Sequence, residues 1–88
     1  MELAGRSGEM EVFARVAQAG SLSAAARALG LTPSAVSRIL ARTEQRLGTR
    51  LMLRTTRAIT LTPEGEAYLR GAHRVLADMR EVGQAITD

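Results

Sequence analysis

The sequence contains no cysteine, no tryptophan and no lysine, and its aromatic side chains are one phenylalanine and one tyrosine. Without cysteine it has neither a disulfide framework nor a thiolate metal site, which fits a cytoplasmic protein. With so few aromatic rings, any core must be built from leucine, valine, isoleucine, alanine and methionine. We therefore expect neither a metal nor another cofactor.

Long apolar runs are also missing. No segment approaches the roughly 20 apolar residues that span a bilayer, and the N-terminus lacks the apolar stretch of a signal peptide. Eighty-eight residues with 45% hydrophobic content suffice for one small domain with a modest core. The composition predicts a small globular protein without a membrane partner.

The basic residues, all twelve of them arginine, are unevenly distributed. The formal net charge is +3, yet residues 38–57 contain six arginines and a single acid, Glu44. Concentrated positive charge is typical of proteins that bind a polyanion. Charge alone leaves open the alternative of a solvated arginine-rich surface, so the choice depends on the elements that present it.

Residues 31–48 begin with a strong helix-start signal. Thr32 can accept a hydrogen bond from an unpaired backbone N–H, and Pro33 at the first helical position loses no hydrogen bond. Apolar residues at helical spacing predict one buried face, made of Val36, Leu40 and Leu47. The opposite face presents hydroxyl and guanidinium groups from Ser34, Ser37, Arg38, Arg42 and Arg46.

Residues 21–29 predict a second, shorter helix just upstream, separated from the first by the turn Gly30-Leu31. A helix, a short glycine-containing turn and a helix with a polar start form the helix-turn-helix pattern, whose second helix enters the major groove of DNA. A helix over residues 8–19, ended by Gly20, completes a tri-helical core, and residues 1–7 are expected to form a loose leader. The inward face of the helix over residues 8–19 should consist of Met10, Phe13, Val16 and Ala17.

After residue 48 the hydrophobic period changes from helical to alternating. Two short half-buried strands are predicted by the alternation of Leu51, Leu53, Ile59 and Leu61 with polar residues. Between them, Arg54-Thr-Thr-Arg57 predicts the tip of a β-hairpin. A basic hairpin beside a helix-turn-helix is a wing, whose arginines can reach phosphates or a narrow minor groove. An ordinary surface hairpin is the alternative.

Residues 63–88 predict one long helix, because Thr62-Pro63-Glu64 repeats the helix-start signal. Its apolar stripe is wider than so small a domain can cover, which predicts a partner helix, most naturally in a symmetric homodimer. The alternative is a helix folded back on its own domain. The predicted dimer interface consists of Tyr68, Leu69, Ala72, Val75, Leu76, Met79, Val82 and Ile86.

These elements predict a mainly α fold with a small β-hairpin. Residues 1–62 would form a winged helix-turn-helix domain, and residues 63–88 a linker and dimerisation helix. The recognition helix would span about residues 33–47 and the wing about residues 54–57. The residues expected to contact DNA are Ser21, Ser23, Thr32, Pro33, Ser34, Ser37, Arg38, Arg42, Arg54, Thr55, Thr56 and Arg57.

The roles of these residues are open to alternatives. Arg38 is the first candidate for a bidentate contact to a guanine edge, and a phosphate contact is its alternative. Ser34 and Ser37 can bond to a base, a phosphate or water, whereas Ser21 and Ser23 are better explained as helix caps. Solvation or pairing with Glu44, rather than base contact, is expected further from the helix start, at Arg42, Arg46 and Arg50.

This ordered set of motifs resembles the N-terminal DNA-binding domain of LysR-type bacterial transcriptional regulators over residues 10–69. The matching residues are Phe13, Ser21-Leu-Ser-Ala-Ala-Ala26, Leu29, Leu31-Thr-Pro-Ser-Ala-Val-Ser-Arg38, Leu40, Glu44, Leu47-Gly48, Leu51-Met-Leu-Arg54, Thr55-Thr-Arg57 and Leu61-Thr-Pro-Glu-Gly65. The resemblance implies sequence-specific binding of double-stranded DNA, antiparallel pairing of the long helices, and tetramers of the full-length proteins. It also implies a C-terminal effector domain that senses a small molecule; that domain is missing here, so an isolated or truncated module is expected.

Three positions differ from the family pattern. Thr43 replaces a usual leucine in the recognition helix, at a cost of roughly 1–3 kcal/mol if the site is buried. Met52 replaces a usual phenylalanine, a change that methionine tolerates because it adapts to irregular gaps. Pro33 stands where some members carry a glutamine that reads adenine, so base reading is expected from Ser34, Ser37 and Arg38.

Two other classes of function fit the sequence less well. A winged helix that binds protein partners would not need a basic recognition helix and a basic hairpin. An enzyme would need a catalytic constellation, but the chain has one histidine, no phosphate-cradling glycine loop and no HExxH motif. The varied polar face of the recognition helix also favours sequence reading over non-specific DNA binding.

Overall fold

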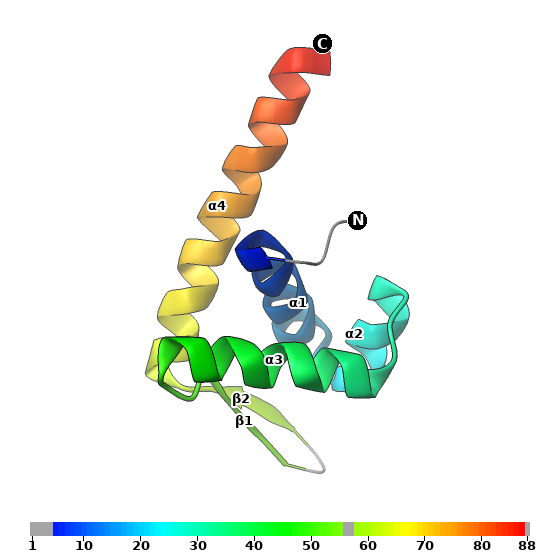
Figure 1. The fold of residues 1–88 in the computed structure, drawn as a ribbon, viewed down its shortest axis with the longest axis vertical. Helices are drawn as coiled ribbons and strands as arrows, with labels where there is room; N and C mark the ends of the chain where they lie inside the picture. The colour runs from blue at the N-terminus through cyan, green and yellow to red at the C-terminus, as the bar shows by residue number, and fades with distance from the viewer. Residues whose placement is uncertain (1–4, 56–57, 88) are drawn as a thin grey trace.

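The computed structural model describes residues 5–55 and 58–87, with side chains up to residue 86. In chain order its elements are α1 (Gly5–Ala19), α2 (Leu22–Leu29), α3 (Pro33–Leu47), β1 (Met52–Arg54), β2 (Ile59–Leu61) and α4 (Pro63–Thr87). Figure 1 shows the first three helices and the hairpin gathered at one end, with the C-terminal half of α4 projecting away from them. This arrangement confirms the predicted mainly α fold with a small β-hairpin. No helix in the described ranges combines the length and apolar character that a membrane span requires.

The boundaries of α2 and α3 follow from local sequence signals. Ser21 Oγ accepts from the backbone N–H of Ala24 at 3.1 Å, and Thr32 Oγ1 accepts from that of Ala35 at 3.1 Å. Gly30 and Gly48 end the two helices with φ of +70°, a left-handed conformation that glycine adopts without steric cost. Ser21, Thr32, Gly30 and Gly48 are therefore confirmed as caps, whereas Ser23 lies within α2 and does not cap it.

Helix α1 differs from its prediction at its start and on its inner face. It begins at Gly5, so residues 5–7 are helical and were wrongly assigned to a loose leader. Glu9 is buried although it is acidic, because Arg46 Nη2 approaches its Oε1 at 2.6 Å and joins α1 to α3. From the sequence, a glutamate on a helix is expected to be exposed to solvent. The burial of Glu9 was not predictable, because its partner lies 37 positions away.

The inner face of α3 consists of Val36, Leu40 and Thr43. Thr43 is buried at the position of the missing leucine, and its Oγ1 donates to the carbonyl of Ile39 at 2.8 Å, so the hydroxyl is satisfied. The prediction that Leu47 belongs to this face is wrong, because its side chain is 41% exposed. Leu47 is the last residue of the helix, where the chain turns away at Gly48 and the core ends.

The hydrophobic core is aliphatic and centres on α1, which packs against α2, α3 and α4. Its buried members are Val12, Phe13, Val16, Ala25, Ala26, Val36, Leu40, Leu51 and Met52. The small side chains of Ala25 and Ala26 allow the close approach of α2 to its neighbours. Phe13 meets Tyr68 of α4 edge to face, with ring centroids 5.0 Å apart.

Tyr68 places its hydroxyl in the interior next to the Glu9–Arg46 ion pair. Its oxygen has no hydrogen-bond partner among the described residues. Burial and the nearby Glu9 carboxylate raise the pKa of Tyr68 above its ordinary value of 10.0, and Arg46 opposes them. The phenol therefore stays neutral over the physiological range, and its ring contributes chiefly through packing.

Strands β1 and β2 pair antiparallel, with Met52 opposite Leu61 and Arg54 opposite Ile59. Because side chains alternate along a strand, Met52 and Arg54 face the domain and Leu53 faces outward, 49% exposed. The prediction that Leu53 is half-buried is thus wrong, because Met52, one position earlier, occupies the core site. The hairpin was correctly predicted, although Thr56 and Arg57, which were predicted at its tip, lie outside the described residues.

The start of α4 is fixed against the residue before β1. Thr62 donates its backbone N–H to the carbonyl of Leu51 at 3.0 Å, and its hydroxyl donates to the carbonyl of Arg50 at 2.7 Å. The same hydroxyl accepts from the backbone N–H of Gly65 at 3.0 Å, which confirms Thr62 as the helix cap. A Cβ at position 65 would lie 1.8 Å from the carbonyl oxygen of Leu51, so only glycine permits this contact.

The apolar stripe of α4 is divided between two environments. Ala72 and Leu76 are buried within the chain, where α4 packs on α1, and Tyr68 and Leu69 pack against the core. These four residues were predicted in a dimer interface, but they already serve the fold of a single chain. The exposed part of the stripe consists of Val75, Met79, Val82 and Ile86.

We predict that Gly65→Ala lowers the free energy of unfolding by about 1–3 kcal/mol or more, because the new methyl group displaces the Leu51 backbone. Gly71→Ala in the same helix is the matched control, since a Cβ there meets no described atom within 4 Å. The control should gain about 0.5–1 kcal/mol from the better helix propensity of alanine. Urea unfolding followed by circular dichroism measures both, and equal stabilisation of the two variants would contradict the close contact.

Candidate nucleic-acid interface

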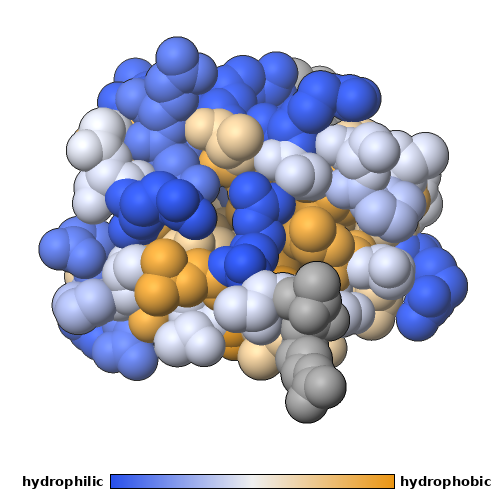
Figure 2. All heavy atoms as spheres, turned by 90° about the horizontal axis from the view of Figure 1, so that it is seen from below, coloured by the Kyte–Doolittle hydropathy of each residue, from blue (hydrophilic) through white to orange (hydrophobic). Residues whose placement is uncertain are grey.

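The first turns of α3 present polar side chains to solvent. Thr32, Pro33, Ser34 and Arg38 are exposed, and Ser37 is half-buried. They face outward because the other side of the helix is held in the core. Figure 2 views the molecule from below, where hydrophilic side chains cover much of the face around smaller apolar areas.

A groove of about 240 Å³ lies between the start of α2 and the hairpin. Ser21, Ser23, Arg54 and Thr55 line it, so two pairs of residues that lie about 30 positions apart in the sequence, all predicted to contact DNA, surround one groove. Ser21 is occupied as the cap of α2, as expected. Thr55 Oγ1 accepts from the backbone N–H of Ala58 at 3.0 Å, which shapes the hairpin where the strands end.

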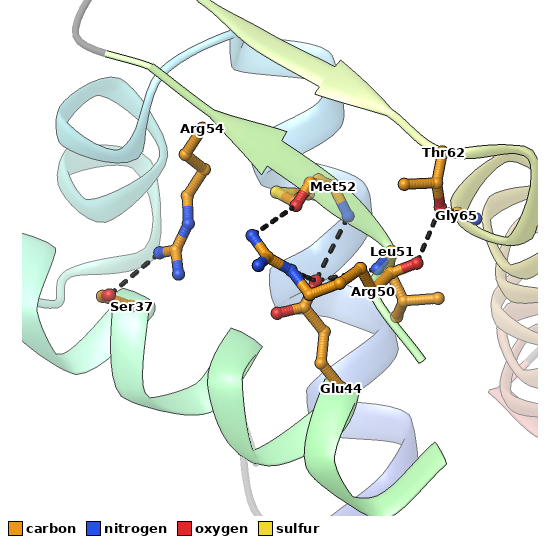
Figure 3. Close-up of polar contacts among 8 residues, drawn as sticks. All are labelled: Ser37, Glu44, Arg50, Leu51, Met52, Arg54, Thr62 and Gly65. Carbon is orange, nitrogen blue, oxygen red and sulfur yellow. Dashed lines mark hydrogen bonds and ion pairs between the residues drawn. The ribbon is translucent and has the colours of Figure 1, made fainter. Parts of the chain in front are cut away.

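Arg54 of the hairpin is turned toward α3. Its Nη1 donates to Ser37 Oγ at 2.9 Å, as Figure 3 shows, and the residue as a whole is half-buried. Two residues that the sequence assigned to separate contacts are therefore bonded to each other. No local pattern predicts this pair, because the residues lie 17 positions apart on different elements.

Glu44 holds the beginning of the hairpin on α3. Its Oε2 accepts from the backbone N–H groups of Leu51 at 2.8 Å and Met52 at 3.2 Å (Figure 3). Arg50 Nε lies 3.6 Å from the same oxygen. Glu44 was predicted only as a partner for arginine, and its bonds to the backbone were not predicted. Its isolation among six arginines was the available signal.

Ion pairing divides the arginines of residues 38–57 into two groups. Arg50 pairs with Glu44, as predicted, whereas Arg46 pairs with Glu9 and is removed from the polar face on which the sequence placed it. Arg38 and Arg42 remain exposed on α3, and Arg54 lies at the hairpin. Positive charge is thus concentrated toward the start of α3 and the hairpin, and Arg57 lies outside the described residues.

A comparison with known protein families agrees with this arrangement of helices and hairpin. The model of the bacterial regulatory helix-turn-helix proteins of the lysR family matches residues 8–66. The chain belongs to the LysR family. The matched range covers α2, α3 and the hairpin completely and ends in the first turn of α4.

Individual LysR-family relatives support the assignment. The chain is 49% identical over 73 residues to the HTH-type transcriptional regulator CrgA of Neisseria meningitidis, an alignment that covers 83% of this chain and 24% of CrgA. It is 38% identical over 77 residues to the HTH-type transcriptional activator AaeR of Escherichia coli, covering 88% of this chain and 25% of AaeR. The LysR-family chain thus spans about a quarter of the length of the curated relatives it matches.

The fold is also similar to a solved LysR-family structure. The crystal structure of the CbnR DBD–DNA complex superposes with a TM-score of 0.87 at 31% identity, covering 94% of this chain and 95% of that chain. Nearly every described element of the LysR-family chain, including α4, therefore has a counterpart there.

We predict that Glu44→Ala lowers the free energy of unfolding by about 1–3 kcal/mol, because the N–H groups of Leu51 and Met52 lose their acceptor. Gln45→Ala, at the exposed neighbouring position, should change it by less than about 0.5 kcal/mol. Urea unfolding compares the two variants. Amide exchange at residues 51 and 52 should be faster in Glu44→Ala; unchanged exchange there would show that the carboxylate does not hold the hairpin.

Proposed function

We propose that this chain binds double-stranded DNA sequence-specifically, as the N-terminal module of a bacterial LysR-type transcriptional regulator. The observation that carries this proposal is the superposition on the CbnR DBD–DNA complex over 94% of the chain. The exposed polar start of α3 and the nearby hairpin support it, because B-form DNA admits one α-helix into its major groove. We assign no catalytic role to the chain.

In this proposal α3 enters the major groove and the wing contacts the backbone or the minor groove. Arg38 is the main base-reading residue, since its fork of donors fits guanine O6 and N7 and its side chain is exposed. Thr32 and the backbone at the start of α3 suit a phosphate, because helix N-termini favour anions, and so do Ser21 and Ser23 at the start of α2. The proposed contact set is completed by Pro33, Ser34, Ser37, Arg42, Arg54, Thr55, Thr56 and Arg57.

The direct test is selection of preferred duplexes from a random pool, followed by affinity measurements on the selected and a random duplex. We predict that Arg38→Ala reduces the preference for the selected duplex by about 1–3 kcal/mol, because a bidentate base contact is lost. Arg74→Ala, which removes an exposed arginine from α4, should leave that preference unchanged. An equal loss on both duplexes would make Arg38 a phosphate contact instead.

The exposed stripe of α4 supports a second part of the proposal, homodimerisation. Val75, Met79, Val82 and Ile86 follow a 4-3-4 spacing, which places them on one face of the projecting half of the helix. Their exposure rises from 41% at Val75 to 80% at Ile86, beyond the reach of the core. A second copy of the same helix is the simplest cover for such a seam.

We predict that Val82→Asp weakens dimerisation by about 2 kcal/mol or more, because a carboxylate would be buried without a partner. The fold should persist, since Val82 is 63% exposed in the single chain. Gln84→Asp, on the opposite side of α4, introduces the same charge and should dimerise normally. Sedimentation equilibrium measures both, and equal dimerisation of the two variants would exclude this seam.

The remaining parts of the proposal concern the full regulator. Residues 1–62 act as the winged helix-turn-helix, and residues 63–88 as the linker and dimerisation helix. A small-molecule effector would act only through a C-terminal domain, which is not among these 88 residues. The relatives named as transcriptional regulators, of which the matched segment is about a quarter, support that larger arrangement.

A further inference from the structure

The bond between Arg54 and Ser37 joins the two elements that the proposed function assigns to DNA. Ser37 lies on the second turn of α3, next to Arg38, and Arg54 ends β1. Arg54 Nη1 and Ser37 Oγ are 2.9 Å apart, a well-formed charge-assisted hydrogen bond (Figure 3). An arginine free to reach a phosphate would extend into solvent as Arg38 does, whereas Arg54 is half-buried.

The chemistry of the two groups determines which one donates the hydrogen bond. A guanidinium is only a donor, so Ser37 Oγ must accept, and the hydroxyl hydrogen of Ser37 remains available to donate elsewhere. The adjacent positive charge disfavours a second donor, such as a base amino group, at the same oxygen and favours an acceptor beyond the hydroxyl. Ser37 beside Arg54 should therefore donate its hydroxyl hydrogen to an acceptor on its partner rather than accept from a donor.

We propose that Arg54 is a positioning residue for base recognition: it fixes the Ser37 hydroxyl as a hydrogen-bond donor to an acceptor on a major-groove base edge. The acceptors of that kind are purine N7, guanine O6 and thymine O4. Arg54 thus contributes to specificity through Ser37, in addition to the general attraction of its charge for DNA. This inference rests on the proposed function, because it assumes that the start of α3 meets base edges.

The test is a double-variant cycle on the selected duplex and on duplexes that carry every single base-pair change. The proteins are the unsubstituted chain, Ser37→Ala, Arg54→Ala and the double variant, each checked by circular dichroism for an unchanged fold. Arg42→Ala is the matched control. It removes an exposed arginine from α3, the helix that carries Ser37, and Arg42 is not bonded to Ser37 in the described residues.

Coupling predicts a specific pattern of base preference. Ser37→Ala and Arg54→Ala should each reduce the preference at the same base pair by roughly tenfold. The double variant should lose no more than Ser37→Ala alone at that base pair. Arg42→Ala should lower affinity for all duplexes alike and flatten the salt dependence, and its effect should add to that of Ser37→Ala.

Two further duplexes identify the acceptor. A 7-deazapurine at the affected base pair should abolish the difference between the unsubstituted chain and Ser37→Ala if N7 is the acceptor, and substitution of the O6 or O4 group tests the other two. If only a neutral methylphosphonate in the backbone abolishes the difference, Ser37 binds phosphate and the base-edge assignment is overturned.

Failure of the inference is distinguishable from failure of the proposed function. If Arg54→Ala lowers affinity for every duplex equally and its effect adds to that of Ser37→Ala, Arg54 is a backbone contact and the coupling is overturned. If the unsubstituted chain shows no preference for any duplex, the proposed function fails first, and the coupling with it.

Discussion

The position of the hairpin depends on how two helices hold one stretch of backbone, residues 50–52. Glu44 on α3 accepts from the N–H groups of Leu51 and Met52, while Thr62 at the start of α4 binds the carbonyl groups of Arg50 and Leu51. Gly65 completes the contact by leaving room for the Leu51 carbonyl oxygen. Because both sides of this backbone are bonded, the hairpin, the recognition helix and the long helix keep fixed relative positions.

The arginines of residues 38–57 differ in their partners. The domain pairs Arg46 with Glu9 and Arg50 with Glu44, and both pairs connect elements of the fold. Arg38 and Arg42 are left exposed at the start and middle of α3, and Arg54 is held against Ser37. Arginines of the same segment thus differ in environment, which their charge alone does not reveal: two are ion-paired, two are exposed, and one bonds to a neighbouring hydroxyl.

Local signals in the sequence predicted most of the fold. Thr32, Pro33 and Gly48 mark α3 by their own conformational preferences, and Ser21, Gly30 and Thr62 do the same for its neighbours. The errors concern residues whose environment depends on distant parts of the chain. Glu9 is buried through an arginine 37 positions away, and Leu53 faces outward because the backbone around Leu51 sets the register of β1. Likewise, no periodicity in the sequence separates the buried Leu76 from the exposed Val82, since the difference is only whether α1 lies beside them.

In the proposed function, the exposed face of α3 and the hairpin bind DNA by contacting its phosphates, which releases counterions, and by contacting base edges. A salt titration of the unsubstituted chain on a selected and a random duplex, with the mass of each complex measured, tests it most directly. We predict a steep fall of log affinity with log salt, with a slope of about −0.9 per neutralised phosphate, and a preference for the selected duplex that survives at high salt. A shallow slope with equal, weak binding to both duplexes would contradict it and would reduce the basic face to solvated surface charge.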